Sequence, residues 1–275
     1  MHVVNIRDED VLRELNLYPL WVRRAAPFAD LVSTRLASRQ SAEPVGPKSD
    51  PQEKGDELAG RTSVRQIAPD WVALKQQVRE CNACTLRAGC TQTVFGIGDE
   101  HADWLFVGEG PGADEDAQGE PFVGQAGKLL DNMLAAIKLK RGDNVYIANV
   151  VKCRPPANRN PAADEVATCL PYLQQQIALI QPKLIVALGK TAATALLGRE
   201  ATLGSMRGVL HDFKLPAMGQ RDDQGRMSGQ CPSIPLIVTY HPAYLLRSPA
   251  EKAKAWQDLC LARATLQLSS NGNAE

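Results

Sequence analysis

The chain has 275 residues, with 31 basic and 31 acidic side chains and 44% hydrophobic residues, which is typical of a soluble globular protein with one sizeable core. The zero formal net charge argues against a protein that coats nucleic acid over its whole surface. The apolar runs are too short to span a membrane, and the acidic N-terminal residues do not resemble a signal peptide, so we expect a cytoplasmic protein without membrane association.

The first quarter of the chain differs in composition from the rest. Residues 8–24 have the apolar spacing of a short amphipathic helix, and the following stretch is rich in Pro, Gly, Ser and charge. We expect an N-terminal helical extension over 1–36, a disordered linker over 37–66, one folded domain over 67–268 and a disordered tail over 269–275. A helix isolated by a long linker suggests a protein partner, and residues 219–233 read as a solvated insertion.

From residue 70 onward, short apolar strands alternate with helices. The expected strands are "WLFVG", "NVYIANVV", "KLIVALG" and "PLIVTY". Helices are expected over 70–81, 124–139, 162–180 and 249–268, with Asp70 as an N-cap and Pro171 as a kink or break. Fully apolar strands alternating with helices predict a three-layer α/β/α fold with a central, mainly parallel four-stranded sheet.

Three polar motifs follow these strands at the carboxyl edge of the predicted sheet, where such folds bind ligands. They are the loop "GEGPGADEDAQGEPFVG" at 108–124, Asn149, and His241. The loop has five acids and no base, so it is unlike a phosphate cradle. Its acids Asp114, Asp116 and Glu120 are expected to form a solvated turn.

The seven cysteines include one C-x2-C pair, Cys81 and Cys84. Together with Cys153 and Cys169 they provide four thiolates, which suit either zinc or an iron–sulfur cluster. Spacing alone does not separate these two, nor does it exclude that Cys153 and Cys169 are simply buried. Cys260 is expected in the core, and the expected loop thiols are Cys90 and Cys231.

The motifs "GEGPGADEDAQGEPFVGQAGKLLD", "NVVKCRPPANRNP" and "VTYHPAYLLR", with the four cysteines, resemble the family 4 uracil-DNA glycosylases. These are DNA repair hydrolases of the base excision pathway that carry a [4Fe-4S] cluster. The resemblance spans roughly 70–268 and implies that the cluster ligands are Cys81, Cys84, Cys153 and Cys169. It implies a uracil site of Gly108, Glu109, Gly110, Glu115, Phe122, Asn149 and His241.

Chemistry agrees with these assignments. A base is reached only after it leaves the stack, and an aromatic ring such as Phe122 returns ~1–3 kcal/mol by stacking on it. The Asn149 amide matches the N3–H donor and O4 acceptor of uracil. Carboxylates stabilise the oxocarbenium-like sugar, and His241 assists the departing base. Better-known relatives keep a water-directing aspartate where this chain has Gly110, so we rank Glu115 first as catalyst and Glu109 second.

Contacts to DNA are expected from two regions. The resemblance implies that Leu245 or Leu246 probes the base stack, with Arg247 beside them. Lys152, Arg154 and Arg159 would form a phosphate-binding face.

Three alternative functions compete with this interpretation of the sequence. A family X-like enzyme that cross-links to DNA is disfavoured, because no histidine lies between Cys153 and Cys169. A nucleotide-binding protein is disfavoured, because the chain has no phosphate-loop motif. A non-catalytic DNA-binding module with a four-cysteine zinc site stays open. We expect a monomer whose partner is uracil-containing DNA.

Overall fold

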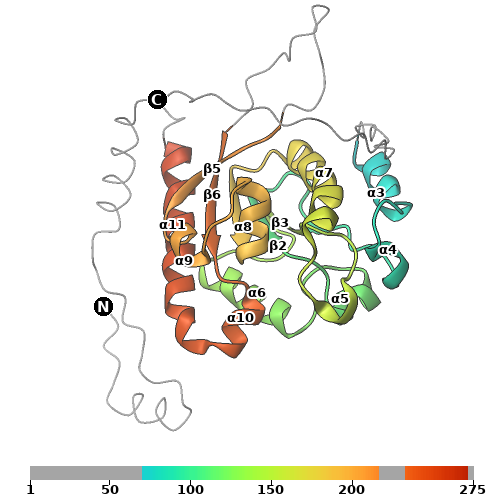
Figure 1. The fold of residues 1–275 in the computed structure, drawn as a ribbon. Coiled ribbons are helices and arrows are strands. Elements are labelled where there is room, and N and C mark those ends of the chain that lie inside the picture. Colours follow the sequence, from blue (N-terminus) through green and yellow to red (C-terminus); the bar gives the residue numbers. More distant parts are fainter. Residues whose placement is uncertain (1–69, 217–232, 272–275) are drawn as a thin grey trace, which may run out of the picture. The chain divides into compact units, whose positions relative to one another are not determined.

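The computed structural model describes residues 70–216 and 233–271. The expected N-terminal helix, the linker, nearly all of the 219–233 insertion and Cys231 lie outside these ranges, as does the end of the chain beyond Asn271. Elements are numbered as in Figure 1.

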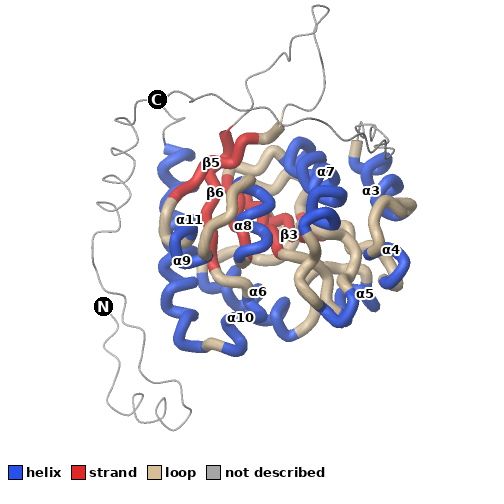
Figure 2. The backbone as a smooth tube through the Cα atoms, in the orientation of Figure 1, coloured by secondary structure: helices blue, strands red, loops and turns tan. Residues whose placement is uncertain are grey.

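A six-stranded sheet forms the centre of the fold, and its strand order is β1-β3-β2-β4-β6-β5 (Figures 1 and 2). The strands are β1 (Ile97–Gly98), β2 (Trp104–Gly108), β3 (Val145–Asn149), β4 (Leu184–Leu188), β5 (Leu210–Lys214) and β6 (Ser233–Thr239). The four central strands are parallel, as predicted, and the two edge strands are antiparallel. The edge strands were not predicted because β1 has two residues and β5 is mostly half-buried or exposed, so neither carries an apolar run.

Helices cover both faces of the sheet. They are α3 (Trp71–Arg79), α4 (Leu86–Gly89), α5 (Ala113–Gln118), α6 (Gln125–Ala136), α7 (Ala163–Ile180), α8 (Lys190–Leu197), α9 (Leu203–Met206), α10 (Pro242–Arg247) and α11 (Lys252–Asn271). Two single 3-10 turns lie at Pro156–Asn158 and Pro249–Glu251. In the part of the chain that the structure describes, no helix is both long and apolar enough to cross a membrane.

Alternation along the strands separates the core into two layers. Leu105 and Val107 of β2 pack in one cluster with the buried faces of α3, α7 and α8. Phe106 points to the other face, where the buried side chains of α6 and α11 lie, and α11 packs against β6 and β4. Figure 1 shows α8 in front of the sheet and α11 beside β5 and β6. The predicted three-layer architecture is confirmed.

Helix boundaries follow local chemistry. Asp70 caps α3 as predicted, because its carboxylate accepts a hydrogen bond from the Ala73 N–H at 2.8 Å. Pro171 lies inside α7 without ending it, since the helix continues to Ile180. The last helix runs to Asn271, past the predicted end at Leu268.

Candidate active site

The carboxyl ends of β2 and β3 bring the first two motifs together. Gly108 and Asn149 are register partners in this parallel pair. A Cβ placed on Gly108 would lie 2.4 Å from Asn149 Oδ1 and 2.5 Å from Phe122 Cζ. Glycine is therefore required here for close approach, and the amide and the aromatic ring meet over its Cα.

The third motif reaches the same place from β6. His241 follows this strand as the N-cap of α10, and its ring stacks on that of Phe122 with centroids 5.5 Å apart. Gly189, after β4, would place a Cβ 3.1 Å from the Cβ of His241. Phe122, Asn149 and His241 thus converge, as the sheet-edge argument predicted.

The tautomer of His241 follows from its contacts. Nδ1 accepts a hydrogen bond from the Ala243 N–H at 3.2 Å, so the neutral ring carries its proton on Nε2. Burial and the nearby Arg247 lower the pKa of His241 to about 4, with the charge of Glu115 acting in the opposite direction. At neutral pH the ring is an uncharged hydrogen-bond donor.

Asn149 has an unused acceptor. Its side chain is 2% exposed, and Oδ1 has no hydrogen-bond donor among the described residues. Buried polar atoms are rarely left unpaired, so an exception in a convergent site indicates a ligand donor.

Glu115 is bound to the loop backbone. One carboxylate oxygen accepts from the N–H groups of Val123 (2.9 Å) and Gly124 (3.1 Å), and the other accepts from Gly112 (3.0 Å). Both oxygens are therefore engaged in holding the loop.

Glu109 is placed differently. One of its oxygens accepts a hydrogen bond from the hydroxyl of Thr191, in the first turn of α8. Thr191 lies close in sequence to Gly189, which neighbours His241, so this carboxylate belongs to the same edge of the sheet.

The expectation that Asp116 lies in a solvated turn was wrong. It is 5% exposed, and its carboxylate accepts from the N–H and hydroxyl of Thr91 (both 2.9 Å) and from the N–H of Gln92 (3.3 Å). These bonds attach α5 to the segment after α4, which explains the burial of a charged group. Asp114 and Glu120 are exposed, as expected.

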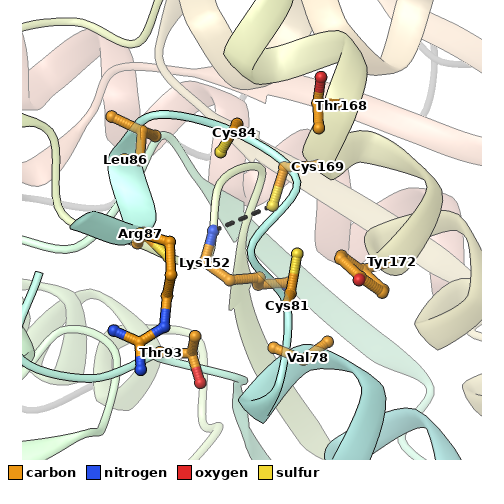
Figure 3. A pocket seen from close by; sticks show the side chains of 11 residues that line it. Val78, Cys81, Cys84, Leu86, Arg87, Thr93, Lys152, Thr168, Cys169 and Tyr172 are labelled. Atoms are coloured by element: carbon orange, nitrogen blue, oxygen red, sulfur yellow. Dashed lines mark hydrogen bonds between the residues drawn. The ribbon is translucent and has the colours of Figure 1, made fainter. Parts of the chain in front are cut away.

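The four predicted cysteine ligands line one pocket (Figure 3). None of the six described cysteines forms a disulfide. Burial raises the pKa of the Cys169 thiol to about 11, and the nearby Lys152 opposes this shift. Burial and the thiol of Cys90, a hydrogen-bond partner, raise the pKa of Cys153.

The structure does not itself show a metal site. Among the described residues, no three His, Cys, Asp or Glu side chains are grouped so that they could hold a metal ion. Zinc requires four ligands about 2.3 Å from one point, whereas a cluster distributes its thiolates over several iron atoms. The four thiols line one shared pocket, and one of them accepts an N–H hydrogen bond. In type and number these ligands fit an iron–sulfur cluster.

The expectation that Lys152 contributes to a phosphate-binding face was wrong. Its side chain is 1% exposed, and Nζ donates to the Asn149 carbonyl (2.9 Å) and to Gln176 Oε1 (2.6 Å). Its backbone N–H donates to Cys169 Sγ at 3.3 Å (Figure 3). Lys152 therefore connects the end of β3 with the cysteine pocket, a role that a single lysine in a sequence does not signal.

Of the residues on α10 that were predicted to contact DNA, some are exposed and one is buried. Leu245 is 1% exposed and packs inside, whereas Leu246 is 44% exposed, so of the two only Leu246 projects outward. Arg247 is exposed next to it.

Arg154 and Arg159 have partners within the chain. Arg154 donates to Asn158 Oδ1 at 2.7 Å. Arg159 forms a two-pronged pair with the buried Glu165, at 2.8 and 2.7 Å, and this carboxylate caps α7 through the Ala162 N–H. Arg159 is thus committed to a structural ion pair, which lowers the pKa of Glu165 to about 2.

Comparison with known proteins identifies the class. Residues 95–260 match the model of the uracil DNA glycosylase superfamily. The type-4 uracil-DNA glycosylase of Pyrobaculum aerophilum is 42% identical over 196 residues, covering 70% of this chain and 92% of its own length. Those of Archaeoglobus fulgidus and Thermotoga maritima are 41% and 40% identical, covering 63% and 66% of this chain and 82% and 85% of their lengths.

The match covers more than half of the chain and places it in the uracil-DNA glycosylase superfamily. Within that superfamily, the chain belongs to the type-4 uracil-DNA glycosylases, and it is a uracil-DNA glycosylase. The predicted resemblance is confirmed, and the alternative of a non-catalytic module is set aside.

Proposed function

We propose that the protein rotates uracil out of DNA, hydrolyses the bond between its N1 and the deoxyribose C1′, and leaves an abasic site for base excision repair. The observation that carries this proposal is the unpaired acceptor of Asn149, buried against Phe122, whose ring stacks on that of His241. The similarity to type-4 uracil-DNA glycosylases supports the substrate.

Base recognition would rest on Asn149 and Phe122. The Oδ1 atom accepts from uracil N3–H, and the amide N–H donates to O4, whereas cytosine presents the reversed pattern. A buried site that is left with mismatched hydrogen bonds discriminates by roughly 10⁴–10⁵. The ring of Phe122 stacks on the base without requiring a polar partner of its own.

His241 would stabilise the leaving group. As the C1′–N1 bond breaks, its electron pair moves onto uracil and negative charge reaches the ring oxygens. The neutral imidazole donates its Nε2–H to that charge, because Nδ1 is occupied by the Ala243 N–H. A neutral donor needs no counter-ion in a buried site.

The two glutamates would have different roles. Glu109 uses one oxygen on Thr191, and its other oxygen orients the attacking water and accepts its proton as the C1′–O bond forms. Glu115 holds the loop through three backbone N–H groups and contributes its negative charge near the sugar cation. This reverses our ranking from sequence, because both oxygens of Glu115 are already engaged.

Entry of the nucleotide would involve α10. Leu246 projects outward beside the exposed Arg247, so it inserts into the stack while the arginine binds phosphate. Arg154 is half-buried and is the remaining candidate near the cysteine pocket.

Cys81, Cys84, Cys153 and Cys169 would hold a [4Fe-4S] cluster. Bound there, the cluster would supply cross-links between the segment after α3, the loop after β3 and α7, without a redox step in base release. Support comes from the shared pocket and the N–H donor of Lys152 toward Cys169.

The test is release of free uracil from a uracil-containing oligonucleotide by wild-type protein, Asn149→Ala and Asn160→Ala. Asn160 is an exposed loop residue and serves as the matched control. We expect kcat/KM to fall about 10- to 100-fold in Asn149→Ala and to stay unchanged in Asn160→Ala. Wild-type protein that binds the oligonucleotide without releasing uracil would refute the proposal.

A further inference from the structure

The peptide that carries Phe122 has an unfavourable backbone conformation. Phe122 has φ of 56°, in the left-handed region that bulky residues avoid, yet its side chain is 5% exposed. Such conformations persist only where the surrounding contacts determine them, and they concentrate at functional sites.

Arg141 holds this segment by hydrogen bonds to its carbonyl groups. It lies between α6 and β3, outside every motif that carries the family resemblance. Its Nη1 donates to the Pro121 carbonyl at 2.9 Å, and its Nη2 donates to the Phe122 carbonyl at 2.7 Å. The planar guanidinium thus fixes two successive peptide groups, which a single ammonium does not match.

Two further features hold the same segment. Glu115 binds the following N–H groups, those of Val123 and Gly124, so oppositely charged side chains hold the carbonyls and the amides of residues 121–124. On α6, a Cβ at Gly127 would overlap the Phe122 carbonyl at 1.8 Å, so glycine is needed for the segment to lie against the helix.

We propose that Arg141 is a positioning residue for uracil excision. It holds residues 121–122 so that the Phe122 ring is presented to the extruded base before binding. This inference rests on the proposed function, because it assumes that Phe122 stacks on uracil. A misplacement of the stacking ring by about 1 Å is enough to lower the rate about a hundredfold.

The chain provides a matched control in Asp131. Its carboxylate accepts from Arg141 Nε at 3.0 Å, but within the described part of the chain it has no hydrogen bond to residues 121–122. Asp131→Ala removes the ion pair and leaves both carbonyl bonds in place. We therefore expect uracil release by Asp131→Ala to stay within about twofold of wild type, since exposed ion pairs contribute little.

The experiment is a double-mutant cycle on kcat/KM for uracil release, with inhibition by free uracil as a second readout. Arg141→Ala should lose about 10- to 100-fold and bind free uracil correspondingly weakly, whereas its affinity for abasic-site DNA stays unchanged. Arg141→Lys should recover part of the loss. In a Phe122→Ala background, Arg141→Ala should cause no further loss.

Four outcomes would count against the assignment. Multiplicative effects of Arg141→Ala and Phe122→Ala would show that Arg141 acts elsewhere and overturn it, and so would an Arg141→Ala enzyme as active as wild type. If Arg141→Ala does not fold, an Arg141→Lys variant with wild-type uracil inhibition overturns it equally. A wild-type protein that releases no uracil refutes the proposed function, and this inference falls with it.

Discussion

Gly108 and Asn149 face each other at the ends of two adjacent parallel strands, and a single added methyl group at Gly108 would overlap the Asn149 Oδ1 at 2.4 Å. The same methyl would reach Phe122 Cζ at 2.5 Å. The Asn149 amide and the Phe122 ring thus both pack against the backbone at the end of β2, and they can do so only because Gly108 has no side chain.

Gly108→Ala should therefore impair the site more than the fold. The atoms that must move are the ends of two side chains, so we expect uracil release to fall at least about tenfold with a small change in melting temperature. Gly204→Ala is the control, because its Cβ meets no atom within 4 Å. Equal activity of the two variants would contradict the geometry.

The two glutamates should respond differently to replacement by glutamine. An amide at position 115 presents N–H groups to backbone N–H groups, so Glu115→Gln should lower both the melting temperature and kcat/KM. Glu109→Gln should lower kcat about 100-fold or more, the typical contribution of a general base, with little thermal destabilisation. Measuring kcat and unfolding together decides this, and a Glu109→Gln enzyme with normal kcat would return the catalytic role to Glu115.

The low pKa of His241 predicts how stability and base release change at acidic pH. Its pKa of about 4 lies below the ordinary 6.5, because burial and Arg247 outweigh the charge of Glu115. The folded state binds this proton less tightly than the unfolded chain, so the contribution of His241 to stability is constant above about pH 6.5 and is lost as the pH falls toward 4.

The rate of base release should accordingly stay constant down to about pH 5 and fall near pH 4, where the ring gains charge and the hydrogen bond to Nδ1 is lost. Single-turnover rates and an NMR titration of the imidazole measure this directly. A midpoint near 6.5 in the titration would show that the ring is not shielded as described.

If the cysteine pocket holds a [4Fe-4S] cluster, the purified protein should contain iron. Purified wild-type protein should absorb broadly in the visible range and contain iron and acid-labile sulfide, and Cys153→Ser should lose both. Cys90→Ser is the control, since Cys90 neighbours Cys153 but does not line the pocket. Stoichiometric zinc with no iron would contradict the cluster.

Much of the fold followed from apolar runs and turn residues. Strands buried on both faces leave an unambiguous signal, as in β2 and β4, and polar residues at their ends are brought together by parallel topology alone. This is why the sequence alone predicts that Asn149 and His241 lie at one site. Edge strands such as β5 lack that signal because part of each faces solvent.

Roles that depend on side-chain partners could not be predicted. Lys152 follows two valines and Asp116 lies in an acidic loop, and only the fold shows that each charged group is buried against specific partners. Leu245 and Leu246 are identical in type, and the helical phase of α10 decides which one is exposed. Arg141 lies outside the motifs in sequence, and its hydrogen bonds to Pro121 and Phe122 depend on the return of the chain after α6.

Phe122, Asn149 and His241 are proposed to bind the extruded base together. A crystal structure of the protein with free uracil would show whether they do. We predict that uracil N3–H donates to Asn149 Oδ1, with the base stacked on Phe122 and His241 Nε2 facing a ring oxygen. Uracil bound elsewhere, or in this site with Asn149 Oδ1 still lacking a donor, would show that these three residues do not form the base site.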